Sequence, residues 1–316
     1  MGPVPSNTVL VVAGPTASGK SDLAVDVAEE FGGVVINADS MQIYEGLEIV
    51  TAAPGPAARK RATHKLYGIR DPAMPCSAGD WLALAEQEIC LAHEEALLPI
   101  VVGGTGMYLR TLMAGIAQMP PVPADIRESV RSRTAREGSI SLHAELAKID
   151  PESAARINAS DSQRIARAVE IYEATGRTLT EWQTDGSEAA AGTAYTFKTV
   201  LLEPPRELLY ATCNARFEKM LMSGALEEIR ALASLNLDTT LPAMKALGIP
   251  NLLRHLAGEM SLEEACKASQ QVTRNYVKRQ GTWFRNQFVA DLSIESQYSD
   301  NIRDHIFSFV SKFMLT

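Results

Sequence analysis

The chain has 316 residues, 46% of them hydrophobic and 22% charged, which is enough apolar material for one large or two modest globular domains. Thirty basic against 38 acidic residues give a net charge of −8, which argues against a surface that binds nucleic acid everywhere but leaves room for a local basic groove. No stretch approaches the roughly 18 apolar residues of a membrane-spanning helix, and the dispersed cysteines and histidines exclude a zinc site of recognisable spacing.

Strand and helix patterns alternate in the first hundred residues. Strands are predicted at 8–14, 33–39 and 98–104, and helices at 18–31 and 78–96, with a Pro/Ala-rich loop at 51–60. Because helices separate successive strands, this order predicts a parallel sheet flanked by helices.

A proline-rich segment at 119–125 ends this alternation. From Asp125 to about Trp182 the pattern indicates short helices without a strand, and a strand returns at 195–204, with a further short one near 289–294. We therefore predict an α/β fold with an all-helical insertion domain. The first part of the core is expected at 1–118, the insertion at 119–190, and the remainder of the core, with a basic C-terminal helix, at 191–316.

The strongest motif follows the first predicted strand and fits G-x-x-x-x-G-K-[ST]. It consists of Gly14, Pro15, Thr16, Ala17, Ser18, Gly19, Lys20 and Ser21. Such a loop turns backbone N–H groups toward a di- or triphosphate at a helix N-terminus, where Lys20 neutralises phosphate oxygens and the Ser21 hydroxyl ligates Mg²⁺. The sheet is therefore predicted to be P-loop NTPase-like.

Two further strand ends carry polar residues. Asp39 follows the second strand, and since neighbouring parallel strands end at one crevice, we expect it to face the phosphate site as a general base or metal-water ligand, or else to cap the next segment. Gln42 is suited to the hydrogen-bonding edge of a purine. The turn Gly103–Tyr108 either presents Thr105 to the phosphates or is an ordinary tight turn.

In this order, GPTASGKS (14–21), DSMQIY (39–44) and GGTGMY (103–108) resemble the tRNA dimethylallyltransferases, also called tRNA isopentenyltransferases, and the likeness continues through 161–179 and 272–286. The resemblance implies transfer of a dimethylallyl group from dimethylallyl diphosphate to the exocyclic amine of the adenine adjacent to the anticodon, with release of diphosphate and with Mg²⁺ as cofactor. It also implies that Asp39 is the base, that Thr105 is catalytic, and that the insertion binds the tRNA anticodon stem-loop.

Contacts with tRNA are expected from residues that match the family and from a basic stretch. Ala265–Ala290 contains five basic residues, no acidic one, and interleaved aromatics, which suits a phosphate-backbone track. The expected tRNA-binding residues are Asp39, Ser40, Met41, Gln42, Thr105, Arg127, Gln163, Arg164, Ile165, Ala166, Arg167, Lys245, Arg274 and Lys278.

Four positions depart from the family's pattern. Ala53 stands in place of a lysine, Gly68 of an acidic residue, Thr212 of an arginine and Ile249 of a tyrosine. These departures bear on donor affinity and tRNA binding. Three other functions are considered: an adenylate isopentenyltransferase acting on a free nucleotide, a P-loop small-molecule kinase, and a non-catalytic RNA-binding protein. We expect a cytoplasmic monomer without membrane contact.

Overall fold

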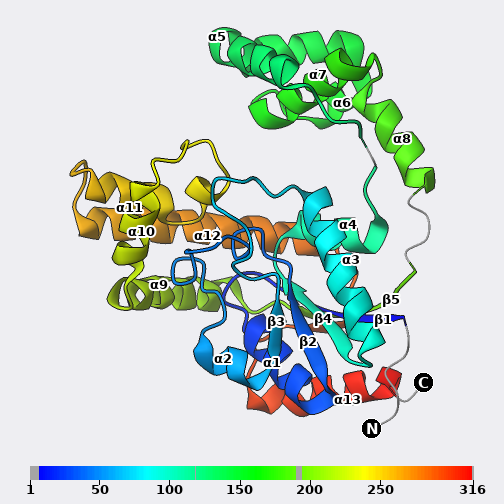
Figure 1. The fold of residues 1–316 in the computed structure, drawn as a ribbon, viewed down its shortest axis with the longest axis vertical. Coiled ribbons are helices and arrows are strands. Elements are labelled where there is room, and N and C mark those ends of the chain that lie inside the picture. Colours follow the sequence, from blue (N-terminus) through cyan, green and yellow to red (C-terminus); the bar gives the residue numbers. More distant parts are fainter. Residues whose placement is uncertain (1–6, 118, 190–193, 315–316) are drawn as a thin grey trace. The chain divides into compact units, whose positions relative to one another are not determined.

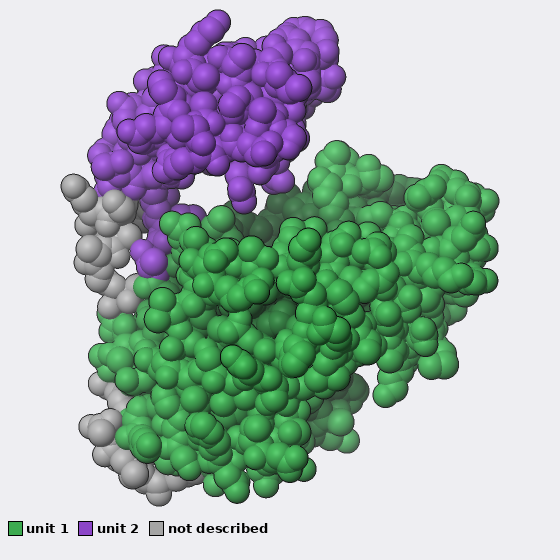
Figure 2. Space-filling model, turned by 180° about the vertical axis from the view of Figure 1, so that it is seen from behind, with its two compact units in different colours: residues 1–113, 194–316 green, residues 114–193 purple. Residues whose placement is uncertain are grey.

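The chain forms two compact units, residues 1–113 with 194–316 and residues 114–193 (Figures 1 and 2). The structure is a computed structural model that describes residues 7–117, 119–189 and 194–314. The insertion predicted at 119–190 lies within the second unit. Its predicted end at residue 190 and the adjoining residue 118 lie outside the described residues, so these boundaries stay predictions.

The α/β unit contains a six-stranded sheet and its covering helices. Its first part runs through β1 (Thr8–Ala13), α1 (Lys20–Phe31), β2 (Gly33–Asn37), α2 (Pro56–Arg61), β3 (Thr63–Lys65), α3 (Ala78–Glu94), β4 (Leu98–Gly103) and α4 (Gly106–Ala114). Its second part runs through β5 (Thr196–Leu202), α9 (Arg206–Met222), α10 (Ala225–Ser234), the 3-10 turn η1 (Ala243–Lys245), α11 (Ile249–Leu256), α12 (Leu262–Gln287), β6 (Leu292–Ile294) and α13 (Asp300–Met314).

All strands of this sheet are parallel, in the order β3-β2-β4-β1-β5-β6, which confirms the predicted architecture. Two elements differ from the prediction. Helix α2 begins inside the segment predicted as a loop, at Pro56, a residue that suits the first helical turn. Strand β3 has three residues at the edge of the sheet, too few to show a strand period in the sequence.

The central strands are buried on both faces, which explains their continuous apolar sequences. In β1, Val9 and Val11 belong to a core with α3, α4 and α12, whereas Leu10 and Val12 belong to a core with α1 and α13 (Figure 1). The sheet is thus enclosed between two helical layers, and the loops lie at the ends of its strands.

One glycine fixes how closely two of these loops approach. Gly103 ends β4, and a Cβ atom there would overlap the backbone carbonyl of Ala38, the residue that follows β2. The Ala38 N–H also donates to the Val102 carbonyl at 2.8 Å. The turns that follow β2 and β4 therefore lie directly against each other.

The helical unit has its own core. It consists of α5 (Ala124–Ile149), α6 (Pro151–Arg156), α7 (Ser162–Thr175) and α8 (Leu179–Ala189), with no strand among its described residues. Val130, Leu146, Ile165 and Val169 are fully buried in this core. Helix α5 is interrupted at Gly138, whose φ of 81° and ψ of 162° are not helical, so it is two shorter helices joined end to end. In the part of the chain that the structure describes, none of the helices has the length and apolarity to span a bilayer.

We expect Gly103→Ala to destabilise the protein by more than about 3 kcal/mol, because its methyl group meets backbone, whereas overpacking that side chains can absorb costs about 1–3 kcal/mol. The matched control is Gly281→Ala in the C-terminal part of α12, where a Cβ meets no atom within 4 Å. That variant should gain about 1 kcal/mol from helix propensity. Urea unfolding measures both changes, and a Gly103→Ala protein as stable as the wild type contradicts the close approach.

Candidate active site

Three loops meet at the carboxyl edge of the sheet, because β2, β4 and β1 are neighbours and run in the same direction. The phosphate loop follows β1, Asp39 follows β2, and Thr105 follows β4. This edge is where parallel sheets bind ligands. The structure therefore brings together the three motifs that lie far apart in the sequence.

The phosphate loop is folded tightly over the N-terminus of α1. A Cβ atom at Gly14 would lie 2.7 Å from the Leu202 carbonyl and 2.7 Å from Ser18 Oγ. Gly19 caps the helix in the left-handed region, with φ of 87°. Ser18 is fully buried, and its hydroxyl has no hydrogen-bond partner among the described residues. A helix N-terminus wrapped in this way favours an anion.

Lys20 lies beneath the loop, where its Nζ donates to the Pro15 carbonyl at 3.2 Å. Burial of the ammonium group lowers the pKa of Lys20 to about 8, an effect that nearby Asp39 partly offsets and Arg216 reinforces. The predicted phosphate-binding lysine therefore titrates close to neutral pH in the free protein. A bound phosphate would favour its charged form.

Asp39 is held in a defined turn by Asn37, a fully buried residue. The Asn37 side chain accepts from the Asp39 N–H at 2.7 Å and donates to the Asp39 and Leu66 carbonyls at 3.0 Å each. One Asp39 carboxylate oxygen accepts from the Met41 N–H at 2.9 Å. The carboxylate thus caps a local turn and also lines the cavity described below.

Thr105 connects the turns that follow β2 and β4, and it does not line the cavity described below. Its hydroxyl accepts from the Ser40 N–H at 3.0 Å and lies 3.4 Å from the Ser40 hydroxyl. Its own N–H points to the Ala38 carbonyl at 3.3 Å. The predicted catalytic threonine therefore fixes the Asp39–Ser40 turn against the start of α4.

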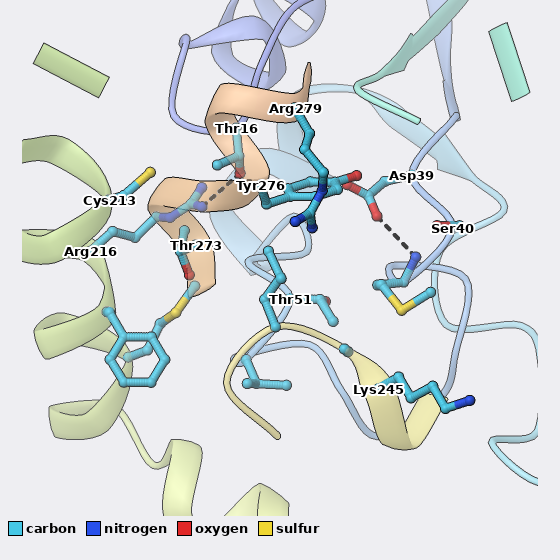
Figure 3. A pocket seen from close by; sticks show the side chains of 16 residues that line it. Thr16, Asp39, Ser40, Thr51, Cys213, Arg216, Lys245, Thr273, Tyr276 and Arg279 are labelled. Carbon is cyan, nitrogen blue, oxygen red and sulfur yellow. Dashed lines mark hydrogen bonds between the residues drawn. The ribbon is translucent and has the colours of Figure 1, made fainter. Parts of the chain in front are cut away.

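The phosphate loop and the turn after β2 border a cavity of about 230 Å³ within the α/β unit, and the turn after β4 supports them from outside its lining (Figure 3). Both polar and apolar side chains line this cavity. Its lining comprises Thr16, Asp39, Ser40, Met41, Val50, Thr51, Cys213, Arg216, Phe217, Met220, Lys245, Ala246, Leu247, Thr273, Tyr276 and Arg279. Of the residues predicted from the sequence, Thr16, Asp39, Ser40, Met41 and Lys245 are therefore brought to one cavity.

Arg216 is a residue that the sequence prediction lacks. Its guanidinium donates to Thr16 Oγ1 at 2.8 Å, which places a second cation beside the phosphate loop (Figure 3). Helix α9 buries Leu209, Cys213 and Phe217 at intervals of four residues, and Arg216 borders this stripe. The stripe is visible in the sequence, but its orientation toward the phosphate loop depends on tertiary packing.

Helix α12 contributes Tyr276 and Arg279, which belong to the basic stretch expected to follow RNA but were not predicted to line the cavity. The Arg279 guanidinium lies 5.5 Å from the centre of the Tyr276 ring. Burial raises the pKa of the Tyr276 hydroxyl, and the charge of Asp39 raises it further, so this group stays protonated near neutral pH. Figure 3 shows Tyr276 and Arg279 beside Asp39. The cavity therefore joins a carboxylate, a phenol and a guanidinium.

Of the other residues of the α/β unit expected to bind tRNA, Gln42 and Arg274 are hydrogen-bonded within the unit, whereas Lys278 is exposed. The Gln42 amide nitrogen donates to the carbonyls of Thr51 at 2.9 Å and Ala52 at 3.0 Å. Arg274 donates to Asn214 Oδ1 at 2.9 Å. Lys278 is exposed on the outer face of α12.

In the helical unit, the expected residues divide between surface and core. Arg127, Gln163 and Arg164 are exposed, whereas Ile165 is fully buried, so its side chain packs in the core and is not available to RNA. Arg164 pairs with Asp161, and Arg167 with Glu170, both at 3.5 Å. These weak, partly exposed pairs leave both arginines free to exchange partners.

The four departures from the family pattern lie outside the described cavity. Ala53 and Gly68 line an adjoining hollow beside α2, which shares Arg216 and Met220 with the cavity. Ile249 is fully buried at the start of α11, and the Thr212 hydroxyl donates to the Leu208 carbonyl at 2.9 Å. Although the arginine expected at position 212 is absent, Arg216 supplies a guanidinium one helical turn later.

Comparison with known proteins shows which family the chain resembles. A family model described as IPP transferase matches residues 42–287, and another described as Isopentenyl transferase matches residues 7–71. The chain is 52% identical over 282 residues to the tRNA dimethylallyltransferase of Rhodospirillum centenum, covering 89% of this chain and 90% of that protein. It is 46% identical over 311 residues to the tRNA dimethylallyltransferase of Paramagnetospirillum magneticum, covering 98% of both.

Solved structures agree with this assignment. The tRNA isopentenylpyrophosphate transferase of Bacillus halodurans has a TM-score of 0.70 at 30% identity, with 98% of this chain and 97% of that chain covered. A eukaryotic dimethylallyltransferase acting on tRNA has a TM-score of 0.82 at 24% identity, with 98% and 79% covered, and this likeness shows the fold.

The lowered pKa of Lys20 predicts a pH-dependent affinity for phosphates. Because the pKa is about 8, the charge is present below that pH and lost as the pH rises through it. Calorimetric titration with inorganic diphosphate should therefore show affinity falling between pH 7 and pH 9. Lys20→Arg, which stays charged throughout, corrects for titration of the ligand itself, and parallel pH profiles for the two proteins contradict the prediction.

Proposed function

Because the chain belongs to the IPP transferase family, we propose that it transfers a dimethylallyl group from dimethylallyl diphosphate to tRNA, at the exocyclic amine of the adenine adjacent to the anticodon. The observation that carries this proposal is the single cavity that joins the phosphate loop, the Asp39 carboxylate and an apolar wall. The reaction needs these three features: a diphosphate site, a proton acceptor and space for a branched five-carbon chain.

Donor binding uses both ends of the donor molecule. The diphosphate would meet the N-terminus of α1, with Lys20 and Arg216 as cations and with Arg216 hydrogen-bonded to the Thr16 hydroxyl of the phosphate loop. The dimethylallyl chain would face the apolar residues of the cavity, which include Val50 and Phe217. Burying such a chain is favourable by about 25 cal/mol per Å².

The adenine amine is a poor nucleophile, because its lone pair is delocalised into the ring. In the proposed step its nitrogen bonds to the donor carbon, while the carbon–oxygen bond breaks and its electron pair leaves with the diphosphate. Asp39 accepts the amine proton as the new bond forms. Lys20 and Arg216 stabilise the charge that accumulates on the leaving diphosphate. The apolar residues of the cavity wall would help to keep water from the reactive allylic carbon.

A magnesium ion at this site would need phosphate oxygens of the donor among its ligands. Among the described residues, no group of three or more His, Cys, Asp or Glu side chains is arranged to hold a metal. Mg²⁺ commonly completes its oxygen shell with substrate phosphates and water. Ser21, exposed in the first turn of α1, is the residue proposed to hold it. When bound, the ion would neutralise negative charge on the diphosphate.

For tRNA, the α/β unit offers a hollow on the outer face of α12, lined by residues that include Lys278, Arg279 and Trp283. A basic and aromatic surface suits a phosphate backbone and unstacked bases. In the helical unit, Arg127 and Arg164 are the exposed cations proposed to contact the anticodon stem-loop.

Among the other functions, transfer to a free nucleotide is not favoured, because the matching relatives extend along the helical unit as well as the core. The same relatives are named tRNA dimethylallyltransferases, which disfavours a small-molecule kinase and a non-catalytic RNA-binding protein. We propose that the enzyme works as a monomer. A tRNA substrate supports a cytoplasmic location.

The decisive experiment incubates unmodified tRNA with the protein, Mg²⁺ and dimethylallyl diphosphate, followed by mass spectrometry of the digested nucleosides. The proposal expects an adenosine heavier by one dimethylallyl group in place of one hydrogen, located beside the anticodon. Incubation of the same donor with adenosine monophosphate tests the free-nucleotide alternative, which is the one supported if only the nucleotide is modified.

Asp39→Asn should lower turnover by about 10²–10⁴-fold, the contribution typical of a general base, and leave tRNA affinity nearly unchanged. Asparagine can still accept from the Met41 N–H, so the turn is preserved. Single-turnover rates and filter binding separate the two effects. Asp71→Asn, an exposed site outside the cavity, is the control. Near-normal turnover in Asp39→Asn excludes Asp39 as the base.

If the outer face of α12 follows the RNA backbone, Lys278→Ala should reduce the slope of log affinity against log salt concentration by roughly one unit. Lys60→Ala, an exposed lysine on α2, should leave the slope unchanged. Binding isotherms measured between low and physiological salt give both slopes. Equal slopes for wild type and Lys278→Ala would make this lysine a solvated surface residue.

A further inference from the structure

Gln280 is a buried polar residue on the core-facing stripe of α12. The stripe comprises Ala265, Ser269, Thr273, Val277, Gln280 and Phe284. Gln280 is 5% exposed. A long amide in such a position is unfavourable unless its hydrogen-bonding groups are satisfied, so its partners indicate why it is there.

Both ends of the Gln280 amide bind backbone groups of the site. Its oxygen accepts from the Thr16 N–H at 2.9 Å, and its nitrogen donates to the Gly104 carbonyl at 2.8 Å. One side chain therefore joins the phosphate loop to the turn after β4. A Cβ atom at Gly104 would overlap the Gln280 amide and lie 2.9 Å from the Gly14 carbonyl, so this contact requires a glycine.

The two backbone partners belong to opposite sides of the proposed reaction. Thr16 is bonded to Arg216 on the diphosphate side. Gly104 precedes Thr105, whose hydroxyl holds Ser40 beside Asp39 on the proton-accepting side. The Tyr276 hydroxyl lies close to both the Thr105 and the Gln280 side chains. Gln280 thus links the phosphate loop to the turn after β4, and Thr105 of that turn connects it to the Asp39–Ser40 turn.

We propose that Gln280 is a positioning residue that sets the distance and orientation between the phosphate loop and the Asp39–Thr105 turns. It acts through Thr16 and Gly104, and this inference rests on the proposed function. Transfer requires the donor carbon and the adenine amine to approach to roughly 3–3.5 Å, and a misplacement of about 1 Å lowers the rate by about 10²-fold. Loss of the link should therefore reduce kcat much more than substrate binding.

The first test uses Gln280→Met, which has nearly the same size but forms neither hydrogen bond. We expect its kcat to fall about 100-fold, with the KM for the donor and the Kd for tRNA within about threefold of the wild type. Gln87→Met, an exposed glutamine on α3, is the control and should match the wild type. A Gln280→Met enzyme with unchanged kcat overturns the proposal. Parallel losses of kcat, donor affinity, tRNA affinity and thermal stability overturn it as well, because they indicate a merely structural role.

Gln280→Glu gives a second readout through its pH profile. An ionised glutamate accepts from the Thr16 N–H but repels the Gly104 carbonyl, whereas a protonated one can donate to that carbonyl. Since burial raises the pKa of a carboxyl group, the variant should regain activity relative to the wild type as the pH falls from 8 to 6. A constant ratio of the two activities across this range overturns the proposal.

A third measurement does not depend on turnover. Hydrogen exchange of the peptide containing Thr16 should be faster in Gln280→Met than in the wild type and in Gln87→Met, because the Thr16 N–H loses its acceptor. Equal exchange in all three proteins overturns the link. If the wild type leaves tRNA unmodified but shows this exchange difference, the proposed function fails while the link between the two loops stands.

Discussion

The site depends on how closely three backbone loops approach one another at the carboxyl edge of the sheet. The turns after β2 and β4 are in contact at Ala38 and Gly103, where a side chain would overlap a carbonyl group. Gly14 likewise allows the phosphate loop to approach the end of β5 closely. Strand pairing fixes the strand ends from which these loops start, so the loops are ordered when the protein folds. The conformational entropy of ordering them is therefore lost on folding and not on ligand binding.

Such a site can contribute to the proposed reaction through alignment as much as through acid–base chemistry. Asn37 fixes the backbone around Asp39, Thr105 fixes Ser40, and Gln280 joins the loops on either side. None of these three side chains lines the described cavity. They hold groups that do line it, so an error in their geometry would be transmitted to the reacting atoms.

The sequence predicts features that depend on local pattern and strand direction. Buried β-branched runs indicate the parallel strands, and the position of Asp39 at a strand end is enough to place it beside the phosphate loop. Arg216 and Gln280 could not be assigned in this way, because their partners are 200 and 264 residues away and depend on the rotation of α9 and α12. Ile165, in contrast, is predicted as a site residue from its motif position, and its side chain is buried in the structure. A motif position expected to contact RNA is a core residue, since a helix that presents arginines to solvent also needs an apolar face.

Net charge is a poor guide to a partner when charge is distributed unevenly. The chain carries −8, yet α12 separates its charges along its length. Its first turns neutralise Lys267 by pairing it with Glu263, whereas Lys278 and Arg279 have no ion-pair partner in the part of the chain that the structure describes. Both unpaired cations line the outer hollow of α12, and Arg279 also lines the cavity. Since an unpaired basic face attracts a polyanion, this local distribution favours RNA at the outer face of α12 in spite of the net negative charge of the chain.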